Sequence, residues 1–457
     1  MNARKNKSNT PGSLRLSHSR LYRGWLSFLL LSALLLSQTG RAQTSPAPAY
    51  QRCGAVEYEK ALARRHPQRV VQRAQLEELI RQQTAQTAFR SGNARTGEVI
   101  YRIPVVVHVI HNNASGVIGG TGNANISDEQ ILSQITVLNE DYRRKPGTPG
   151  FNTNPVGADT GIEFFLANRD PEGRPSTGIT RHYYARQSTF DIYDDATLLA
   201  DIAYWPSDKY LNIWVTTLRG DFLGYAQFPT APTLPGLTDE TDERTDGAII
   251  DHRNFGREIG TVTRAPYRQG RTTTHEIGHW LGLIHTWGDE VCGDDYVADT
   301  PPTESPNQTE ECRERFSNCN GVRTRNQIEN YLDYSPDACM NLFTGNQRDR
   351  MRAVLQVSPR RQRLIRSVAS LPESETLTLS VYPNPARQST DLEIRLKGFQ
   401  SFDVDLIDLT GRLIQTRRYD NFPSSLISLP LHSLAVGVYM VRVRTDRETT
   451  AKRIVVY

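Results

Sequence analysis

The chain has 457 residues, a formal net charge of +4 and five cysteines. This length accommodates one large hydrophobic core together with additional modules. The positive charge is spread thinly and no basic run is interleaved with aromatic residues, which argues against nucleic acid binding. Beyond the N-terminal region no stretch is long and apolar enough to cross a bilayer, so we expect no membrane span in the mature protein.

Residues 1–42 have the pattern of a secretory signal. Arg20 and Arg23 precede an apolar run over residues 25–36, which is too short to span a bilayer comfortably. Residues 40–42, Gly-Arg-Ala, offer a cleavage point. We therefore expect an exported protein. The alternative is an N-terminal membrane anchor, but nothing extends the apolar run, and the lack of a nearby cysteine argues against a lipoprotein.

Residues 43–94 are rich in Arg, Gln and Ala, with a helical stretch near Val70 to Ile80 and little strand character. This composition is typical of a short pro-segment rather than of an independent core. From Glu98 the character changes. The sequence "YRIPVVVHVI" (101–110) is a β-branched run that predicts a buried strand.

We expect residues 95–368 to form one domain in which strands and helices alternate in a mixed layer. A helix is predicted to begin at Ser127, where Gln130 would complete a capping box. Apolar residues then recur at helical spacing and define a stripe that faces the core. Further strands are predicted at residues 161–167, 210–218 and 246–252.

The run "HEIGHWLGLIH" carries the clearest chemistry of the chain. His275 and His279 are four residues apart and would share one face of a helix. Glu276 would lie beside them without ligating the same ion. Gly282 permits the left-handed conformation that ends a helix, so that His285 swings in as a third ligand.

Three protein ligands and one open position are typical of a catalytic zinc site. Zinc lowers the pKa of bound water to about 7, and Glu276 would take the proton and return it to the leaving amine. The alternative is a buried helix on which the histidines have no chemical role. That arrangement would need separate hydrogen-bond partners for three histidines on one surface, so the metal interpretation is favoured.

The other chemical signal comes from the cysteines. Cys292, Cys312, Cys319 and Cys339 are clustered just after the histidine motif. In an exported protein they most often form two disulfides, for which three connectivities exist. Cys53 is left over near the N-terminus.

Residues 373–457 contain short alternating strands separated by turn residues, as in "TLSVYPNPA", "FDVDLIDLTGR" and "GVYMVRVRTD". This pattern predicts a small all-β sandwich.

The histidine run resembles the long zinc signature of the metzincin metallopeptidases. With "VADTPPT" and "NYLDYSPDACMNLFT" nearby, residues 98–365 are similar to the pappalysin family. The resemblance implies an α+β metzincin-type catalytic domain. Its parts would be a twisted mixed sheet with helices, an active-site helix and a more irregular lower subdomain.

The resemblance also implies roles for residues below the zinc site. Leu332 holds the place of the methionine that metzincins carry in a tight turn, and its similar volume would keep the apolar cushion. Tyr334 matches the tyrosine that stabilises the oxyanion, although a turn tyrosine is more often structural. Asp337 matches the acid that selects Arg or Lys just after the scissile bond; the alternative is a turn-capping residue beside Pro336.

For the cysteines, the resemblance implies the pairs Cys292 with Cys319 and Cys312 with Cys339. Cys53, in "RCGAVEYE", is similar to a pro-segment cysteine whose thiolate occupies the fourth zinc position and keeps a zymogen latent. A stray free thiol is the alternative. We expect maturation at Ala94–Arg95.

The loop "GDDYVADTP" aligns with a calcium-binding loop of the family. Its candidate ligands are Asp295, the carbonyl of Val297, and Thr300. An acidic loop that is merely solvated is the alternative.

The C-terminal sandwich resembles the sorting domain of type IX secretion, which would be removed during export. A carbohydrate-binding sandwich is the alternative. The chain is therefore expected to be a zinc endopeptidase that acts on proteins or peptides and is made as a latent precursor. It would be exported by the type IX machinery, either into the medium or to the cell surface. The competing hypotheses are an exopeptidase and a binding or adhesion protein that keeps a metallopeptidase fold.

Overall fold

The computed structural model describes residues 52–91, 100–231, 243–365, 376–397, 400–422 and 424–457. The signal expected at residues 1–42 and the cleavage expected at Ala94–Arg95 lie outside these ranges. Within them, no helix combines the length and the apolar character that crossing a bilayer requires.

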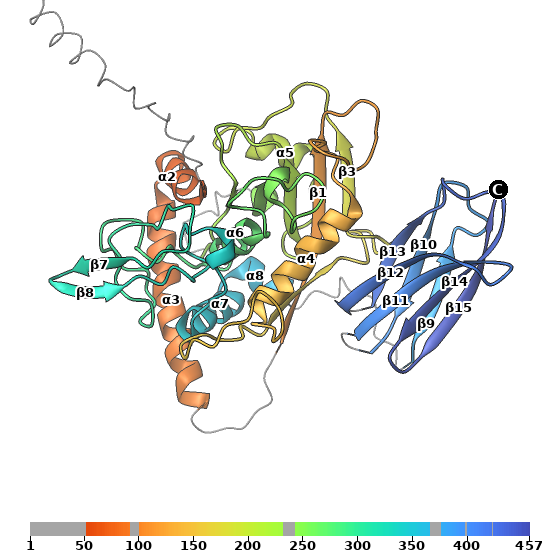
Figure 1. Cartoon of the computed structure of the whole chain (residues 1–457). Helices are drawn as coiled ribbons and strands as arrows, with labels where there is room; N and C mark the ends of the chain where they lie inside the picture. Colours follow the sequence, from red (N-terminus) through yellow and green to blue (C-terminus); the bar gives the residue numbers. More distant parts are fainter. Residues whose placement is uncertain (1–51, 92–99, 232–242, 366–375, 398–399, 423) are drawn as a thin grey trace, which may run out of the picture. The chain divides into compact units, whose positions relative to one another are not determined.

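A mixed sheet forms the centre of the larger domain (Figure 1). Strand β1 pairs in parallel with β2 and β3 along one edge and with β4 along the other. Strand β4 continues in parallel to β6, and β5 closes the sheet as an antiparallel edge strand. The strands are β1 (Tyr101–His111), β2 (Ile162–Leu166), β3 (Ile179–Tyr183), β4 (Leu211–Thr216), β5 (Gly224–Ala226) and β6 (Gly247–Asp251).

Strand β1 is buried on both faces, as its β-branched run predicts. Val105, Val107 and Val109 contribute to the main core, which also contains residues of helices α4 (Asp128–Tyr142) and α6 (Arg271–Trp280). Ile110 packs on the opposite face, in a cluster that contains residues of α2 (Ala55–Arg65) and α5 (Ala196–Ile202). The sheet is therefore a layer between two sets of helices.

Helix α4 begins where the sequence predicts. The Ser127 hydroxyl oxygen accepts a hydrogen bond from the backbone N–H of Gln130 at 3.2 Å. The reciprocal half of the predicted capping box is wrong. The side-chain oxygen of the buried Gln130 instead accepts a hydrogen bond from the backbone N–H of Thr261 at 3.0 Å. Its amide nitrogen donates to the carbonyl oxygens of His252 and Phe255, at 2.9 and 2.8 Å, because these buried groups need a partner.

The lower half of the domain follows α6 and is mostly irregular. It contains the hairpin of β7 (Phe316–Cys319) and β8 (Val322–Arg325), and then α7 (Gly345–Val357) and α8 (Pro359–Leu364). Short 3-10 turns occur at η1 (Glu243–Thr245), η2 (His252–Asn254) and η3 (Asp337–Cys339).

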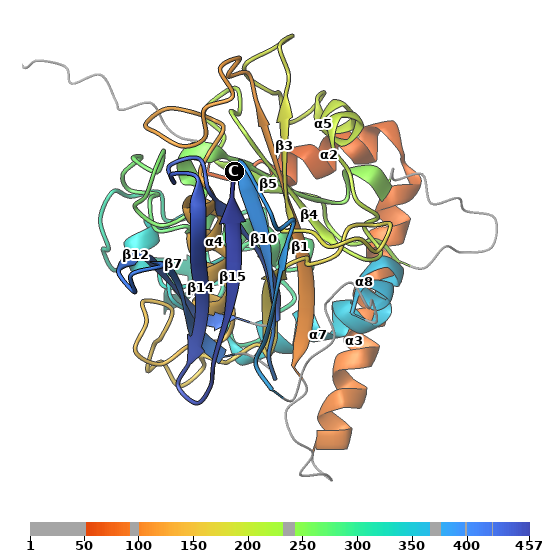
Figure 2. The same cartoon turned by 90° about the vertical axis from the view of Figure 1, so that its right-hand side faces the viewer.

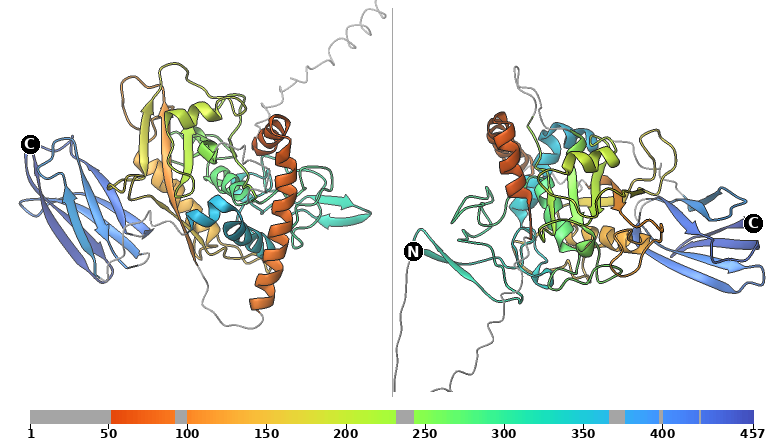
Figure 3. Two further views of the ribbon diagram at one scale, coloured as in Figure 1. Left: turned by 180° about the vertical axis from the view of Figure 1, so that it is seen from behind. Right: turned by 90° about the horizontal axis from the view of Figure 1, so that it is seen from above.

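The helical stretch predicted near Val70 to Ile80 belongs to a longer helix, α3 (Gln68–Ser91). Helix α3 runs beside α7 (Figure 3). Side chains of α2 and α3 are buried against the larger domain and form no core of their own.

The C-terminal residues form two antiparallel sheets around a shared apolar core (Figure 2). One sheet has the order β13-β10-β9 and the other β12-β11-β14-β15. The strands are β9 (Thr378–Tyr382), β10 (Ser389–Arg395), β11 (Gln400–Asp408), β12 (Leu413–Phe422), β13 (Ser425–Pro430), β14 (Gly437–Thr445) and β15 (Thr449–Val456). This is the small all-β sandwich that the alternating pattern predicts.

Candidate metal centre

Helix α6 carries the first two histidines, and its N-terminus is capped from a distant segment. One carboxylate oxygen of Asp337 accepts hydrogen bonds from the backbone N–H groups of Gln269 and Arg271, at 2.9 and 3.2 Å. These groups would otherwise have no partner inside the helix. Ile277 and Trp280 point into the main core, which leaves the face with His275 and His279 for the site.

Gly282 turns the chain after α6. Its φ of +86° lies in the left-handed region, and a Cβ there would lie 2.7 Å from Val354 Cγ2. Both facts require glycine at this position. The turn returns His285 to the helix, so that its Nε2 lies 3.2 Å from that of His275 and 3.1 Å from that of His279.

The hydrogen-bond partners of the three histidines indicate which ring nitrogen of each carries the proton. Each Nδ1 faces an acceptor: the carbonyl of Tyr331 at 2.6 Å for His275, the carbonyl of Leu283 at 2.8 Å for His279, and a carboxylate oxygen of Asp289 at 2.5 Å for His285. Each Nδ1 therefore carries its proton, and three unprotonated Nε2 atoms converge on one buried point.

Burial also keeps the imidazoles of His275 and His279 neutral. It lowers the pKa of His279 to about 3 and holds the pKa of His275 well below its usual range. Neutral imidazole is the form that binds zinc. The side chains that are present therefore fit a metal ion.

Glu276 lies beside this point and is fully buried. Burial raises the pKa of its carboxyl group to about 8. One carboxylate oxygen has no hydrogen-bond partner among the described residues, and the other lies 3.4 Å from the sulfur of Cys53. A Cβ at Gly224 of β5 would lie 3.1 Å from Glu276 Cγ, so a glycine allows the edge strand to approach the carboxylate.

The structure brings Cys53 to the same point. Its sulfur and the ligand atoms of the three histidines all lie within 4.8 Å of one another. Burial, and then the neighbouring Glu276, raises the pKa of the thiol well above its usual range. The backbone N–H of Gly54 donates to the carbonyl of Gly224 at 2.9 Å, which fixes the segment on the edge of β5.

Leu332 and Tyr334 pack close to the histidines. Leu332 is fully buried, and its Cδ2 lies 3.1 Å from the position that a Cβ of Gly278 would take. It therefore packs directly against α6. The ring centroid of Tyr334 lies 4.9 Å from that of His285 and 5.8 Å from that of His275.

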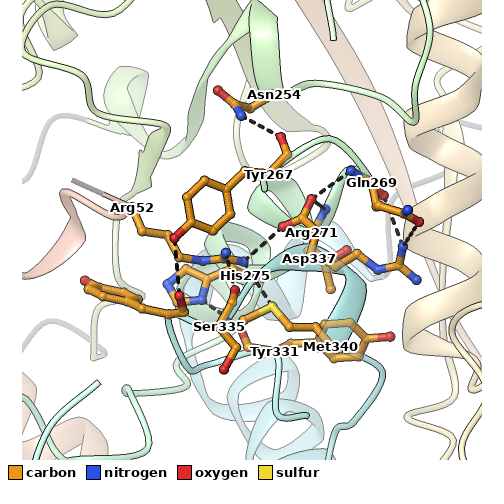
Figure 4. A network of polar contacts seen from close by, with 12 residues as sticks. Arg52, Asn254, Tyr267, Gln269, Arg271, His275, Tyr331, Ser335, Asp337 and Met340 are labelled. Carbon is orange, nitrogen blue, oxygen red and sulfur yellow. Dashed lines mark hydrogen bonds and ion pairs between the residues drawn. The ribbon is translucent and has the colours of Figure 1, made fainter. Parts of the chain in front are cut away.

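Asp337 also contacts the N-terminal segment (Figure 4). The Arg52 guanidinium lies 3.4 Å from its second carboxylate oxygen, and both side chains are 0% exposed. Arg52 further donates to the carbonyl of Ser335 at 2.7 Å and stacks on the ring of Tyr267, with 4.6 Å from its guanidinium carbon to the ring centroid. Asp337 thus caps α6 with one oxygen and faces a cation with the other.

Sequence reasoning missed Arg52, Asp289 and Trp287. The Trp287 ring stacks on His285 at 4.3 Å between centroids, with the planes 8° apart. For Asp289 a local signal existed, because a carboxylate four residues after a ligand histidine is placed to fix the ring that binds the metal. Arg52 had no such signal, since its partner Asp337 lies 285 residues away.

The remaining predicted groups lie in the irregular half. Two disulfides join Cys292 with Cys319 and Cys312 with Cys339, and these are the pairs that the family resemblance implied.

The three calcium candidates lie in one turn. The hydroxyl oxygen of Thr300 lies 2.7 Å from a carboxylate oxygen of Asp295 and 2.7 Å from the carbonyl oxygen of Val297. Burial raises the pKa of Asp295 to about 7. The single hydroxyl proton of Thr300 can be donated to only one of these two oxygen atoms at a time.

Known proteins match this chain in two parts. Residues 195–356 match the peptidase M43 family, described as pregnancy-associated plasma protein-A, and residues 380–457 match a secretion system C-terminal sorting domain. An extracellular metalloprotease of Coccidioides posadasii is 34% identical over 227 residues, which cover 50% of this chain and 68% of the relative. The chain belongs to the pappalysin family of metalloproteases.

Solved structures of the same kind agree with this assignment. Mature mirolysin of Tannerella forsythia, in complex with a cleaved peptide, is 39% identical with a TM-score of 0.50 and covers 59% of this chain and 96% of its own. A mutant of Tannerella forsythia promirolysin is 35% identical with a TM-score of 0.53 and covers 69% of this chain and 97% of its own. This pappalysin-family protein is thus a secreted metalloendopeptidase with a metzincin-type fold, and its family implies a catalytic zinc.

Proposed function

We propose that this protein is a secreted zinc endopeptidase made as a latent precursor, with His275, His279 and His285 as the zinc ligands. The observation that carries the proposal is the convergence of three buried Nε2 atoms with the Glu276 carboxylate beside them. The proposed domains are the signal at 1–42, the pro-segment at 43–94, the catalytic domain at 95–368 and the sorting domain at 373–457. The sorting domain would deliver the precursor to the type IX machinery.

Zinc bound by the three histidines would polarise the scissile carbonyl and lower the pKa of a bound water to about 7. Glu276 is the proposed general base, which accepts a proton from the attacking water and donates it to the leaving amine. Its buried, partly unpaired carboxylate supports this role. Tyr334 is proposed to donate a hydrogen bond from its hydroxyl group to the developing oxyanion.

We propose that the substrate residue just after the scissile bond is Arg or Lys. The support is Arg52, whose guanidinium is fully buried against Asp337, Ser335 and Tyr267. These partners bury the guanidinium of Arg52, so the same site has the charge and the shape to bind the guanidinium of a substrate arginine.

The order of Arg52 and Cys53 also supports latency. In a substrate, the residue that enters the Asp337 pocket would follow the scissile bond in the sequence. Arg52 instead precedes Cys53, whose sulfur lies where the Nε2 atoms of the three histidines converge. We call this place the metal point. The pro-segment would therefore cross the site in the direction opposite to a substrate, and it would offer no peptide bond in the orientation for attack.

Calcium binding by Asp295, the carbonyl of Val297 and Thr300 remains a proposal. It is supported by the close approach of their oxygen atoms and by the burial of the Asp295 carboxyl group. One second function has an observation in its favour. Leu332 in place of the family methionine favours a catalytically weak binding or adhesion protein.

Replacing Glu276 tests the catalytic proposal against that second function. In processed protein, we expect Glu276→Ala to lower kcat/KM on casein-derived peptides by about 100-fold to 10,000-fold, with one zinc per chain retained in elemental analysis. His279→Ala is the contrast, because it should lose zinc and activity together. Normal turnover by Glu276→Ala would remove Glu276 from the mechanism, and an inactive wild-type protein with bound zinc would favour the binding protein.

A further inference from the structure

Most of the contacts of the helical pro-segment (residues 52–91) are remote from the metal point. Helix α2 inserts Tyr58 into an apolar cluster on the catalytic domain, where its ring centroid lies 4.8 Å from that of Tyr225. Trp214 and Phe222 belong to the same cluster. Helix α2 is therefore bound by aromatic packing that does not involve Cys53.

Helix α3 makes the second contact. Leu76 and Ile80 are both 3% exposed and pack against Ala353 and Val354 of α7. The two side chains are four residues apart and so share one face of the helix. Burial of such a stripe contributes stability that is independent of the site chemistry.

An ion pair lies in the middle of this stripe. Both carboxylate oxygens of Glu77 accept hydrogen bonds from Arg350 of α7, each at 2.6 Å. The Arg350 and Glu77 side chains are 5% and 19% exposed. The Arg350 Nε also donates to the carbonyl of Gly282 at 2.8 Å, so the pair reaches the turn that positions His285.

The two helices are also joined to each other. The guanidinium of Arg69 in α3 donates two hydrogen bonds to Glu59 of α2, each at 2.7 Å. Arg73 stacks on Phe228 of the catalytic domain, with 4.2 Å from its guanidinium carbon to the ring centroid. The two successive helices are therefore linked to each other and held on the catalytic domain at several points.

From these contacts we infer that the pro-segment stays bound to the catalytic domain after the chain is cut between residues 91 and 100, and so acts as a dissociable inhibitor. The inference rests on the proposed zymogen function. A cut there removes only the covalent tether, that is, the high local concentration of the pro-segment. The aromatic contact, the apolar stripe and the Glu77–Arg350 pair all remain. The surface formed by Ala353, Val354 and Arg350 is then a binding site for an amphipathic helix with an acidic residue between two apolar ones.

The test uses the full precursor with Glu276→Ala and with residues 92–99 replaced by the recognition sequence of a site-specific protease. After complete cleavage, we expect the pro-segment to elute with the catalytic domain in size-exclusion chromatography. Elution of the free pro-segment at micromolar protein concentration would overturn the inference. Because the added protease makes the cut, the result does not depend on the proposed activity of the chain itself.

Three further variants in this background separate the anchors. Cys53→Ala should leave the cleaved complex intact, whereas complete release would show that the thiol alone holds it and would overturn the inference. Glu77→Gln should weaken binding on the order of 100-fold, because the buried Arg350 loses its charged partner. Glu78→Gln is the matched control, since Glu78 is 47% exposed and pairs with Arg81 on the same helix. Equal behaviour of the Glu77 and Glu78 variants would also contradict the inference.

Discussion

Asp289 contacts His285, the proposed third zinc ligand, on the side away from the metal point. Its carboxylate accepts the Nδ1 proton of His285 at 2.5 Å, and its own backbone has a φ of +62°, a conformation that a non-glycine residue rarely adopts. Retention of a strained backbone at this position is consistent with a role for the side chain. We therefore propose that Asp289 positions His285 for the metal.

We expect Asp289→Asn to lower the affinity for zinc by about 10-fold to 100-fold, because the amide is a weaker acceptor and orients His285 less firmly. Competition with a chromophoric chelator measures this directly and does not depend on turnover. Glu290→Gln, at the exposed neighbouring position, is the control. Equal zinc affinity in the two variants would reject the positioning role.

Asp337 caps α6, and we propose that it also recognises the substrate; Asp337→Asn separates these two roles. The amide oxygen still accepts from the N–H groups at the start of α6, but the negative charge is lost. We expect the kcat/KM for peptides with Arg after the scissile bond to fall by about 30-fold or more relative to peptides with Leu there. Profiling of a peptide library measures the ratio, and an unchanged preference would show that Asp337 only caps the helix.

Residues within one short motif were predictable because the spacing of α6 and one glycine turn fix their geometry. His275, Glu276, His279, Gly282 and His285 are of this kind. Arg52 and the carbonyl acceptors behind the histidines were not predictable, because they meet only through tertiary structure.

At the scale of elements, helix ends also show that local contacts were predictable from the sequence and tertiary contacts were not. The Ser127 cap of α4 was predicted from local sequence, but the predicted reciprocal bond of Gln130 was wrong, because the Gln130 side-chain oxygen accepts from the backbone N–H of Thr261 instead. The box forms instead at α7, where Thr344 accepts from the Gln347 N–H and the Gln347 side chain accepts from the Thr344 N–H. Thr344 also donates to Asp299 at 2.6 Å.

We expect Thr344→Ala to cost about 2 kcal/mol of unfolding free energy and Ser127→Ala about 1 kcal/mol, because only the former breaks several bonds at once. Urea unfolding of both variants in the Glu276→Ala background gives the comparison. An equal cost would mean that the contact of the Thr344 hydroxyl group with Asp299 adds no stability.

Strands were predictable from the sequence where both of their faces are buried. The buried β1, β2, β4 and β6 were found within about two residues at each end. Strand β3 was missed because it is largely half-exposed, and β5 because it has only three residues. Yet β5 is the edge strand that contacts both Gly54 and Glu276, so a strand that the sequence did not predict lies at the proposed active site.

At the scale of the whole molecule, we propose that latency depends on Cys53 beside the three histidines, on Arg52 against Asp337 and on the docked helices. We expect precursor with Cys53→Ala to hydrolyse a short peptide before pro-segment removal, but more slowly than the processed enzyme. Adding Arg52→Ala should raise the rate further. A Cys53→Ala precursor as latent as wild type, measured with a fluorogenic peptide, would assign latency to the other contacts alone.

The two disulfides span residues 292–319 and 312–339 and overlap in sequence. Together they tie down a stretch that has little regular hydrogen bonding and ends beside Tyr334 and Asp337. Such bonds form in oxidising surroundings and not in a reducing cytosol. We therefore expect this side of the site to gain its covalent frame only once the chain has left the cytosol.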